Sequence, residues 1–84
     1  MDPIEPLRTF VVEELGWIAP REELTPDVDL LERGVLDSLG IFRLIEFIED
    51  ELGVQIDDDE LVPTNFATLA AISSLVDSKQ RARA

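Results

Sequence analysis

The chain has 84 residues, a length that predicts one small domain, and 45% of them are hydrophobic, enough to fill a thin core. Nineteen acidic residues against seven basic ones give a formal net charge of −12. Nucleic acid and anionic membrane surfaces are therefore poor partners, because both require clustered lysines and arginines. The charge favours a partner with a basic surface, although acidity also serves solubility alone.

Two residue types that support much of enzyme chemistry, cysteine and histidine, do not occur in the sequence. Without cysteine there is no disulfide framework and no thiolate chemistry. The start of the chain, residues 1–5, lacks the basic and apolar regions of a signal peptide. No hydrophobic run reaches the length needed to span a membrane. We therefore expect a monomeric protein in the cytoplasm.

The first predicted helix runs from about Pro3 to Leu15. Asp2 can cap it, and Pro3 and Pro6 both fall in a first turn, where a missing N–H costs little. Its apolar face, at three- and four-residue spacing, consists of Ile4, Leu7, Phe10, Val11 and Leu15. Gly16 then ends the helix.

Residues 17–37 form a long connection that contains two prolines and Gly34. A helical turn at 21–24 and a chain reversal at 25–27 interrupt it. A loop of this length in a compact domain is commonly functional or held by apolar anchors. The predicted anchors are Val28, Leu30, Leu31, Val35 and Leu36.

The strongest pattern is a second helix from Ser38 to about Leu52, stopped by Gly53. Asp37 and Ser38 are both favoured at a helix start. The buried face is predicted to hold Ile41, Leu44, Ile45, Ile48 and Leu52. Phe47 is assigned to the edge of the core, whereas Phe42 fits the core edge, a contact with a partner protein or a contact with a molecule that the protein holds.

The opposite side of this helix is acidic near its start and carries an isolated leucine. That combination favours a docking surface over a merely solvated face. The predicted partner contacts are Asp37, Leu39, Phe42, Arg43, Glu46 and Glu49. Leu39 alone would be an ordinary surface leucine, but it directly follows Ser38.

The remainder of the chain predicts a turn or short helix at 63–66 and a last long helix from a cap at Thr68 to about Ser78. The core face of the last helix is predicted to hold Leu69, Ile72, Leu75 and Val76. Before them, Val54 and Ile56 point inward. Residues 1–78 thus make one all-α domain, a small four-helix bundle with three main helices, one short helix and a long first loop. Residues 79–84 are expected to be a disordered tail.

The acidic run from Asp57 to Glu60 has three interpretations: a solvated turn or first helical turn, a partner contact, or a calcium site. An EF-hand loop requires a ligand where Leu61 stands, so we favour the turn and predict no metal site.

Ser38 lacks what a nucleophilic serine needs, because a chain without histidine cannot form a Ser-His-Asp triad. The neighbouring carboxylate of Asp37 is by its chemistry a weak base, and Lys79 falls in the predicted tail. There is no glycine-rich phosphate loop, and a small helical bundle offers little room for a cleft around paired carboxylates. We therefore predict no catalytic residue and treat Ser38 as a substrate for another enzyme, or else as a plain helix cap.

Asp37-Ser38-Leu39 heads an acidic amphipathic helix and follows Leu30-Leu31-Glu32-Arg33-Gly34-Val35-Leu36. From about Leu30 to Val76 this arrangement resembles the acyl carrier and peptidyl carrier protein superfamily. The resemblance implies that a phosphopantetheinyl transferase moves 4′-phosphopantetheine from coenzyme A onto Ser38, with Mg²⁺ held mainly by that enzyme. The arm then holds an acyl or aminoacyl group as a thioester. The implied partners are an adenylating ligase or acyltransferase that loads the arm, and tailoring or condensing enzymes that use the cargo.

The residues before the serine also indicate which carriers the chain resembles. Carrier domains of multimodular peptide synthetases more usually show Gly-Gly-His or Gly-Gly-Asp there, so the chain resembles discrete, free-standing carriers. Glu46 stands where fatty-acid carriers commonly show an apolar residue, which favours natural-product (polyketide or nonribosomal peptide) biosynthesis. Two rival functions stay open: an acidic helical interaction module without a cofactor, and a small catalyst that uses carboxylates, which requires a strongly perturbed carboxyl pKa in a cleft.

Overall fold

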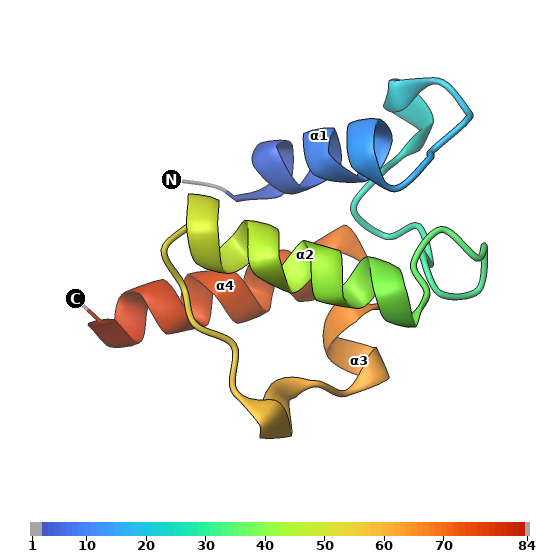
Figure 1. The fold of residues 1–84 in the computed structure, drawn as a ribbon. Coiled ribbons are helices and arrows are strands. Elements are labelled where there is room, and N and C mark those ends of the chain that lie inside the picture. Colours follow the sequence, from blue (N-terminus) through green and yellow to red (C-terminus); the bar gives the residue numbers. More distant parts are fainter. Residues whose placement is uncertain (1–2, 84) are drawn as a thin grey trace.

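The computed structural model describes residues 3–83, and every regular element in that range is helical (Figure 1). The helices are α1 (Ile4–Glu14), α2 (Ser38–Glu51), α3 (Pro63–Phe66) and α4 (Leu69–Arg83), with single 3₁₀ turns η1 (Arg21–Glu23) and η2 (Asp58–Glu60). The predicted bundle of three main helices and one short helix is thereby confirmed. None of the helices in the described range combines the length and the apolar character needed to cross a membrane.

The helices place the start of α2 at one end of the bundle. α2 runs opposite to α1 and in the same general direction as α4, as Figure 1 shows. α1 therefore begins, and α4 ends, at the far end of the molecule from Ser38. The predicted cap of the first helix, Asp2, lies outside the described residues; Pro3 occupies the position before the first turn.

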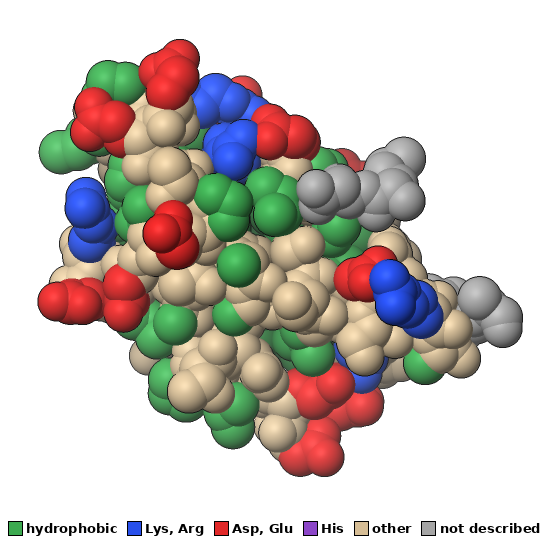
Figure 2. All heavy atoms as spheres, turned by 180° about the vertical axis from the view of Figure 1, so that it is seen from behind, with side chains coloured by type: hydrophobic (Ala, Val, Ile, Leu, Met, Phe, Trp, Pro, Cys, Tyr) green, Lys and Arg blue, Asp and Glu red, His purple; other side chains and the backbone are tan. Residues whose placement is uncertain are grey.

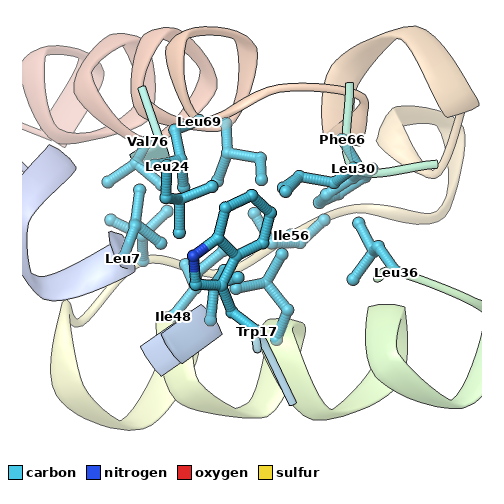
Figure 3. Packing of buried hydrophobic residues seen from close by; sticks show 14 residues of the cluster. Leu7, Trp17, Leu24, Leu30, Leu36, Ile48, Ile56, Phe66, Leu69 and Val76 are labelled. Carbon is cyan, nitrogen blue, oxygen red and sulfur yellow. The ribbon is translucent and has the colours of Figure 1, made fainter. Parts of the chain in front are cut away.

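The core draws side chains from all four helices and from the loops between them (Figure 3). Its fully buried members in the helices are Leu7, Val11, Leu44, Ile48, Phe66, Leu69, Ile72 and Val76. Predicted core residues at the margins of the helix faces, such as Phe10, Ile41, Ile45 and Leu75, are only partly buried. This difference follows from the small size of the domain, because a thin bundle covers only the centre of each apolar face.

Backbone hydrogen bonds hold the long first loop against the other end of the sequence. The N–H of Leu30 donates to the carbonyl oxygen of Ala67 at 2.7 Å. The N–H of Ala70 donates to the carbonyl oxygen of Pro26 at 2.9 Å. Leu30 and Leu36 are fully buried, as predicted for anchors. The sequence pattern did not identify Leu24, which is also buried. The loop leading to Ser38 is therefore an ordered part of the fold.

Trp17 is a further anchor of this loop that the sequence pattern did not identify. Its ring is buried among residues of α1, α2 and the loop, as Figure 3 shows with Leu7, Leu24 and Ile48. The indole Nε1–H donates to the carbonyl oxygen of Pro20 at 3.1 Å. The guanidinium carbon of Arg33 lies 5.9 Å from the ring centroid, within cation–π range. The indole thus joins the beginning of the first loop, at Pro20, to its end near Arg33.

The last helix differs from its predicted end near Ser78, because α4 continues to Arg83. Where the sequence predicted a disordered tail at 79–84, residues 79–83 are helical. Residues 79–83 are all strong helix formers, and Lys79 holds this part of α4 to the rest of the fold, since its Nζ lies 2.5 Å from Glu60 Oε1 and 3.2 Å from Asp57 Oδ2. The Gln80 side-chain amide also donates to the carbonyl oxygen of Leu52 at 3.5 Å. These partners lie about 20 or more residues away in sequence, so no local pattern could reveal them.

Replacing Lys79 by glutamine is expected to lower the melting temperature in a pH-dependent way. Its hydrogen bond lowers the pKa of Glu60 below the usual 4.5, and the same bond raises the pKa of Lys79 above the usual 10.5. The pair therefore stabilises the fold between those values. That stabilisation is lost as pH falls through the lowered pKa of Glu60 or rises through the raised pKa of Lys79. Thermal unfolding of wild type and variant across pH measures the difference.

The matched control for Lys79 is Arg81→Gln, which removes the same charge from the same helix. Among residues 3–83, Arg81 is paired only with Asp77, one turn earlier, and its side chain is 81% exposed. Exposed pairs of this kind contribute little to stability. An equal loss in both variants, or a loss from Lys79→Gln that does not change with pH, would contradict the assigned role of Lys79.

Candidate functional site

Asp37 caps the helix that presents Ser38. Its backbone is extended (φ −112°, ψ −172°), and its Oδ1 accepts a hydrogen bond from the N–H of Gly40 at 2.7 Å. Ser38 is the first helical residue. The sequence pattern allowed either residue to act as the cap. In the structure the carboxylate does so, and the serine hydroxyl is not needed for this purpose.

The Ser38 side chain is exposed at this helix start. Within residues 3–83 no hydrogen-bond partner of its hydroxyl is found, so the oxygen is available to an incoming group. The first turn of a helix also carries N–H groups without intrahelical partners and the positive end of the helix dipole. Such a helix start suits a negatively charged phosphodiester next to the serine oxygen.

Gly40 lets the helix start close tightly, and the sequence analysis missed it. It is buried, and a β-carbon added there would lie 3.2 Å from Asp37 Oδ1 and 3.3 Å from Leu36 Cδ1. Both distances are shorter than nearly all real contacts of a β-carbon. The available signal was a glycine inside a strongly periodic helix. A glycine there destabilises the helix by about 1 kcal/mol relative to alanine, so its presence indicates a packing reason.

An apolar pocket of about 280 Å³ opens beside Ser38, between α2 and the segment that leads into α3. It is lined by Leu31, Ser38, Ile41, Phe42, Leu61, Val62, Pro63 and Phe66. Ser38 is the single polar residue among the described residues that line it. Phe42, Leu61 and Val62 remain 62%, 40% and 41% exposed, so the mouth of the pocket presents apolar surface to solvent. Phe42, whose role the sequence pattern does not decide, lies at this mouth.

The contribution of Leu61 and Val62 was missed because these residues come from a different part of the sequence. The available signal was an apolar pair directly after the acidic run at 57–60. The run itself is a turn: the N–H of Asp57 donates to Glu60 Oε1 at 2.8 Å, and Lys79 contacts both residues. Oxygens of Asp57, Asp59 and Glu60 lie within 4.8 Å of one another, and internal bonds account for the positions of Asp57 and Glu60.

Four of the predicted partner-contact residues form one exposed ridge along α2: Leu39, Phe42, Glu46 and Glu49. They recur every three or four residues, so they share one side of the helix. Leu39 is 69% exposed, directly beside Ser38. Figure 2 shows the side of the molecule opposite to the view in Figure 1, where most of the acidic side chains lie toward the margins and hydrophobic side chains reach the surface between them.

Two of the predicted contact residues also have internal roles. The Arg43 guanidinium donates from Nη1 to the carbonyl oxygen of Glu14 at 3.0 Å, and its Nη2 lies 3.3 Å from Glu14 Oε1. Arg43 is thus turned toward α1 and away from the ridge. Glu49 Oε2 accepts from the N–H of Ile56 at 3.2 Å, which fixes the chain after α2. Phe47 is partly buried against the core, which confirms its assignment to the core edge.

Comparison with known proteins identifies a family whose members carry a modified serine, in agreement with the exposed Ser38. The family model described as "Phosphopantetheine attachment site" matches residues 5–76. The "Probable acyl carrier protein PigG" of Serratia sp. is 36% identical over 56 residues, which cover 67% of this chain and 64% of the relative. An "Acyl carrier protein" of Nitratidesulfovibrio vulgaris is 38% identical over 56 residues, which cover 67% and 71%. One from Saccharopolyspora erythraea is 33% identical over 57 residues, which cover 68% and 58%.

The chain belongs to the phosphopantetheine attachment site family, whose members include the acyl carrier proteins. It spans slightly less than two thirds of the length of the Serratia relative and more than two thirds of the Nitratidesulfovibrio one. Members of this family carry 4′-phosphopantetheine covalently on a serine and are not enzymes. They work with a phosphopantetheinyl transferase and with enzymes of acyl-handling pathways.

The residues of this chain fit such a group. Attachment requires an accessible hydroxyl, and Ser38 is exposed at a helix start whose cap is supplied by Asp37. The negative charge of a phosphodiester suits the N-terminal end of α2. The apolar pocket formed with Phe42, Leu61 and Val62 lies next to that hydroxyl and offers a surface for uncharged parts of the arm or its cargo.

Proposed function

We propose that Ser38 is the attachment serine of this chain and that the protein is a carrier of acyl or aminoacyl groups. The observation that carries the proposal is that two neighbouring residues at the start of α2 have different roles. Asp37 caps the helix, and the Ser38 hydroxyl is left exposed beside an apolar pocket. The arm, once attached, supplies a terminal thiol that holds the cargo as a thioester. The chain itself presents and orients the arm.

We also propose that the exposed ridge of α2, with Asp37 before it, is the surface that partner enzymes bind. Leu39 supplies apolar contact area beside the attachment point, while Glu46 and Glu49 supply negative charge along the same side. Arg43, the remaining predicted contact residue, is turned toward α1 by its bonds to Glu14, so in this proposal it meets a partner only at the margin of the ridge. Charge complementarity with a basic partner speeds docking and fixes its register. The partners in this proposal are a phosphopantetheinyl transferase, a loading ligase or acyltransferase, and later condensing or tailoring enzymes.

The proposed setting is a specialised pathway for natural products of the polyketide or nonribosomal peptide type. Glu46 supports this, since it places an exposed charge on α2 where carriers of fatty-acid synthesis commonly show an apolar residue. The relatives are acyl carrier proteins from several bacteria, so an acyl cargo fits at least as well as an aminoacyl one.

The test is incubation of the purified chain with coenzyme A, Mg²⁺ and a broad-specificity phosphopantetheinyl transferase, followed by mass spectrometry. The intact mass should rise by one phosphopantetheine. Trypsin cuts after Arg33 and Arg43, and the peptide Gly34–Arg43 contains Ser38 as its single hydroxyl residue. The added mass should therefore appear on that peptide, which identifies the modified residue without a mutation.

Two results would count against the proposal. An unchanged mass, with the fold confirmed by circular dichroism and the transferase active on another carrier, would favour the interaction module without a cofactor. Added mass on a peptide other than Gly34–Arg43 would leave a carrier protein but remove Ser38 as its attachment residue.

Truncation of Leu39 to alanine tests the proposed partner ridge. We expect kcat/KM of the transferase to fall several-fold, since a side chain that fills a pocket on the partner contributes on the order of 1–2 kcal/mol. The fold should be unaffected, because Leu39 is 69% exposed. The matched control is Ile18→Ala, which truncates a 99% exposed side chain in the first loop. Equal kinetics for both variants and wild type would remove Leu39 from the contact surface.

A further inference from the structure

A groove runs between α1 and α2, on the flank of α2 away from the Ser38 pocket. Two overlapping hollows, of about 660 and 440 Å³, form it and share Phe10, Glu14, Phe47 and Glu51. The rings of Phe10 and Phe47 make its floor, with centroids 4.6 Å apart and ring planes inclined at 31°. Both phenylalanines are only partly buried, so the floor presents aromatic surface to whatever enters the groove.

The rim of the groove is strongly acidic. Its charged lining residues are Glu13 and Glu14 from α1 and Arg43, Glu46, Asp50 and Glu51 from α2. Arg43 is bonded to Glu14. Among residues 3–83 the other four carboxylates have no cationic partner within ion-pair distance. Unopposed charges of one sign repel each other and create a negative potential over the aromatic floor.

The position of the groove leaves the attachment serine free. Ser38, Ile41 and Phe42 line the pocket on the α3 side of α2, whereas Phe47 and Glu51 line the groove on the α1 side. At about 100° per residue these two sets point to nearly opposite flanks of the helix. Figure 1 shows α1 alongside α2 with α3 on the other side. Glu46 lies both on the groove rim and on the exposed ridge, but a molecule seated against Phe10 and Phe47 would not cover the start of α2.

We propose that this groove docks a basic, amphipathic helical segment of a partner protein, which inserts an aromatic or leucine side chain against Phe10 and Phe47. Lysine or arginine residues beside that anchor would meet the uncompensated carboxylates of the rim. Aromatic and leucine anchors gain most from a floor of aromatic rings. The docking requires no arm, so it goes beyond the proposed carrier function and does not depend on modification of Ser38.

The experiment uses the full-length, unmodified chain labelled with ¹⁵N and a synthetic helical peptide as the probe. The peptide carries lysines on one face and leucines with one phenylalanine on the other; a scrambled peptide of equal composition is the control. We expect the largest amide shifts at Phe10, Glu13, Phe47 and Glu51. The double variant Glu13→Lys/Glu51→Lys should weaken binding by about tenfold at low salt, and less at higher salt.

The matched control is Glu22→Lys/Glu23→Lys, which makes the same change in net charge at exposed residues of η1, away from the groove. It should weaken binding less than about twofold. If both double variants weakened peptide binding equally, the loss of affinity would follow from net charge alone, and the proposal would be overturned. Three other results would also overturn the proposal. The first is a peptide that shifts mainly the amides of Leu39 and Phe42, and the second is a peptide that fails to bind at low salt. Groove amides that shift with protein concentration in the absence of peptide would indicate that a second copy of the chain is the occupant.

Discussion

Replacing Ser38 by alanine is expected to abolish attachment of phosphopantetheine and to leave the free energy of unfolding within about 0.5 kcal/mol of wild type. The chemical effect is complete because alanine offers no oxygen for the phosphodiester. The fold is expected to be unaffected, because the hydroxyl is exposed and the capping bond comes from Asp37 to the N–H of Gly40 at 2.7 Å. Intact mass after incubation with the transferase and urea unfolding of the same sample measure both effects.

The complementary variant is Asp37→Ala, which removes the cap and keeps the hydroxyl. It should lower the free energy of unfolding by about 1 kcal/mol, the usual loss for a capping side chain. Attachment should be slower but still reach completion, because Ser38 is intact. If Ser38→Ala destabilised the protein as much as Asp37→Ala, the assignment of the two roles would be wrong. If Asp37→Ala could not be modified at all while folded, the carboxylate would be essential to the transferase.

Replacing Phe66 by alanine is expected to lower the free energy of unfolding by about 3–5 kcal/mol, the usual loss for a buried phenylalanine. Phe66 is 1% exposed and is the largest of the fully buried side chains. Single domains have total stabilities of about 5–15 kcal/mol, so this one change removes a large share. It also removes a wall of the pocket beside Ser38. Urea unfolding followed by far-ultraviolet circular dichroism gives the difference.

The same substitution at Phe42 is the control for Phe66. Phe42 also lines the pocket, but it is 62% exposed, so Phe42→Ala should change the free energy of unfolding by less than about 0.5 kcal/mol. The pair separates a phenylalanine that supports the fold from one that only borders the pocket. A large loss from Phe42→Ala would mean that the pocket mouth contributes to the core. A small loss from Phe66→Ala would mean that the core refills the cavity.

Local patterns in the sequence were sufficient for the helices and for the candidate serine. The three-and-four spacing of Leu44 and Ile48 placed α2 and its buried side correctly, because helix periodicity is set by neighbouring residues. Ser38 could be selected because the residue types before and after it resemble those of a known family. The division of roles between Asp37 and Ser38 could not be read, since both residues are equally good at a helix start.

The parts that escaped prediction depend on contacts between distant segments. Lys79 holds the end of α4 to Glu60, and no local property of residues 79–83 indicates that partner. The pocket beside Ser38 likewise needs Leu61 and Val62, whose position depends on how the chain returns after α2. The groove floor joins Phe10 to Phe47 across two helices. Periodicity indicates which side of a helix is buried, but not which neighbour covers it.

The buried position of Trp17 has a spectroscopic consequence. It is the single tryptophan of a chain without tyrosine, so the intrinsic fluorescence of the protein comes almost entirely from one ring in the first loop. That ring contacts Arg33 and bonds to Pro20, whereas circular dichroism is dominated by the helices. The two signals therefore observe different parts of the molecule. Coincident transitions would show that the loop and the bundle unfold together, and an earlier change in fluorescence would show the loop detaching from an intact bundle.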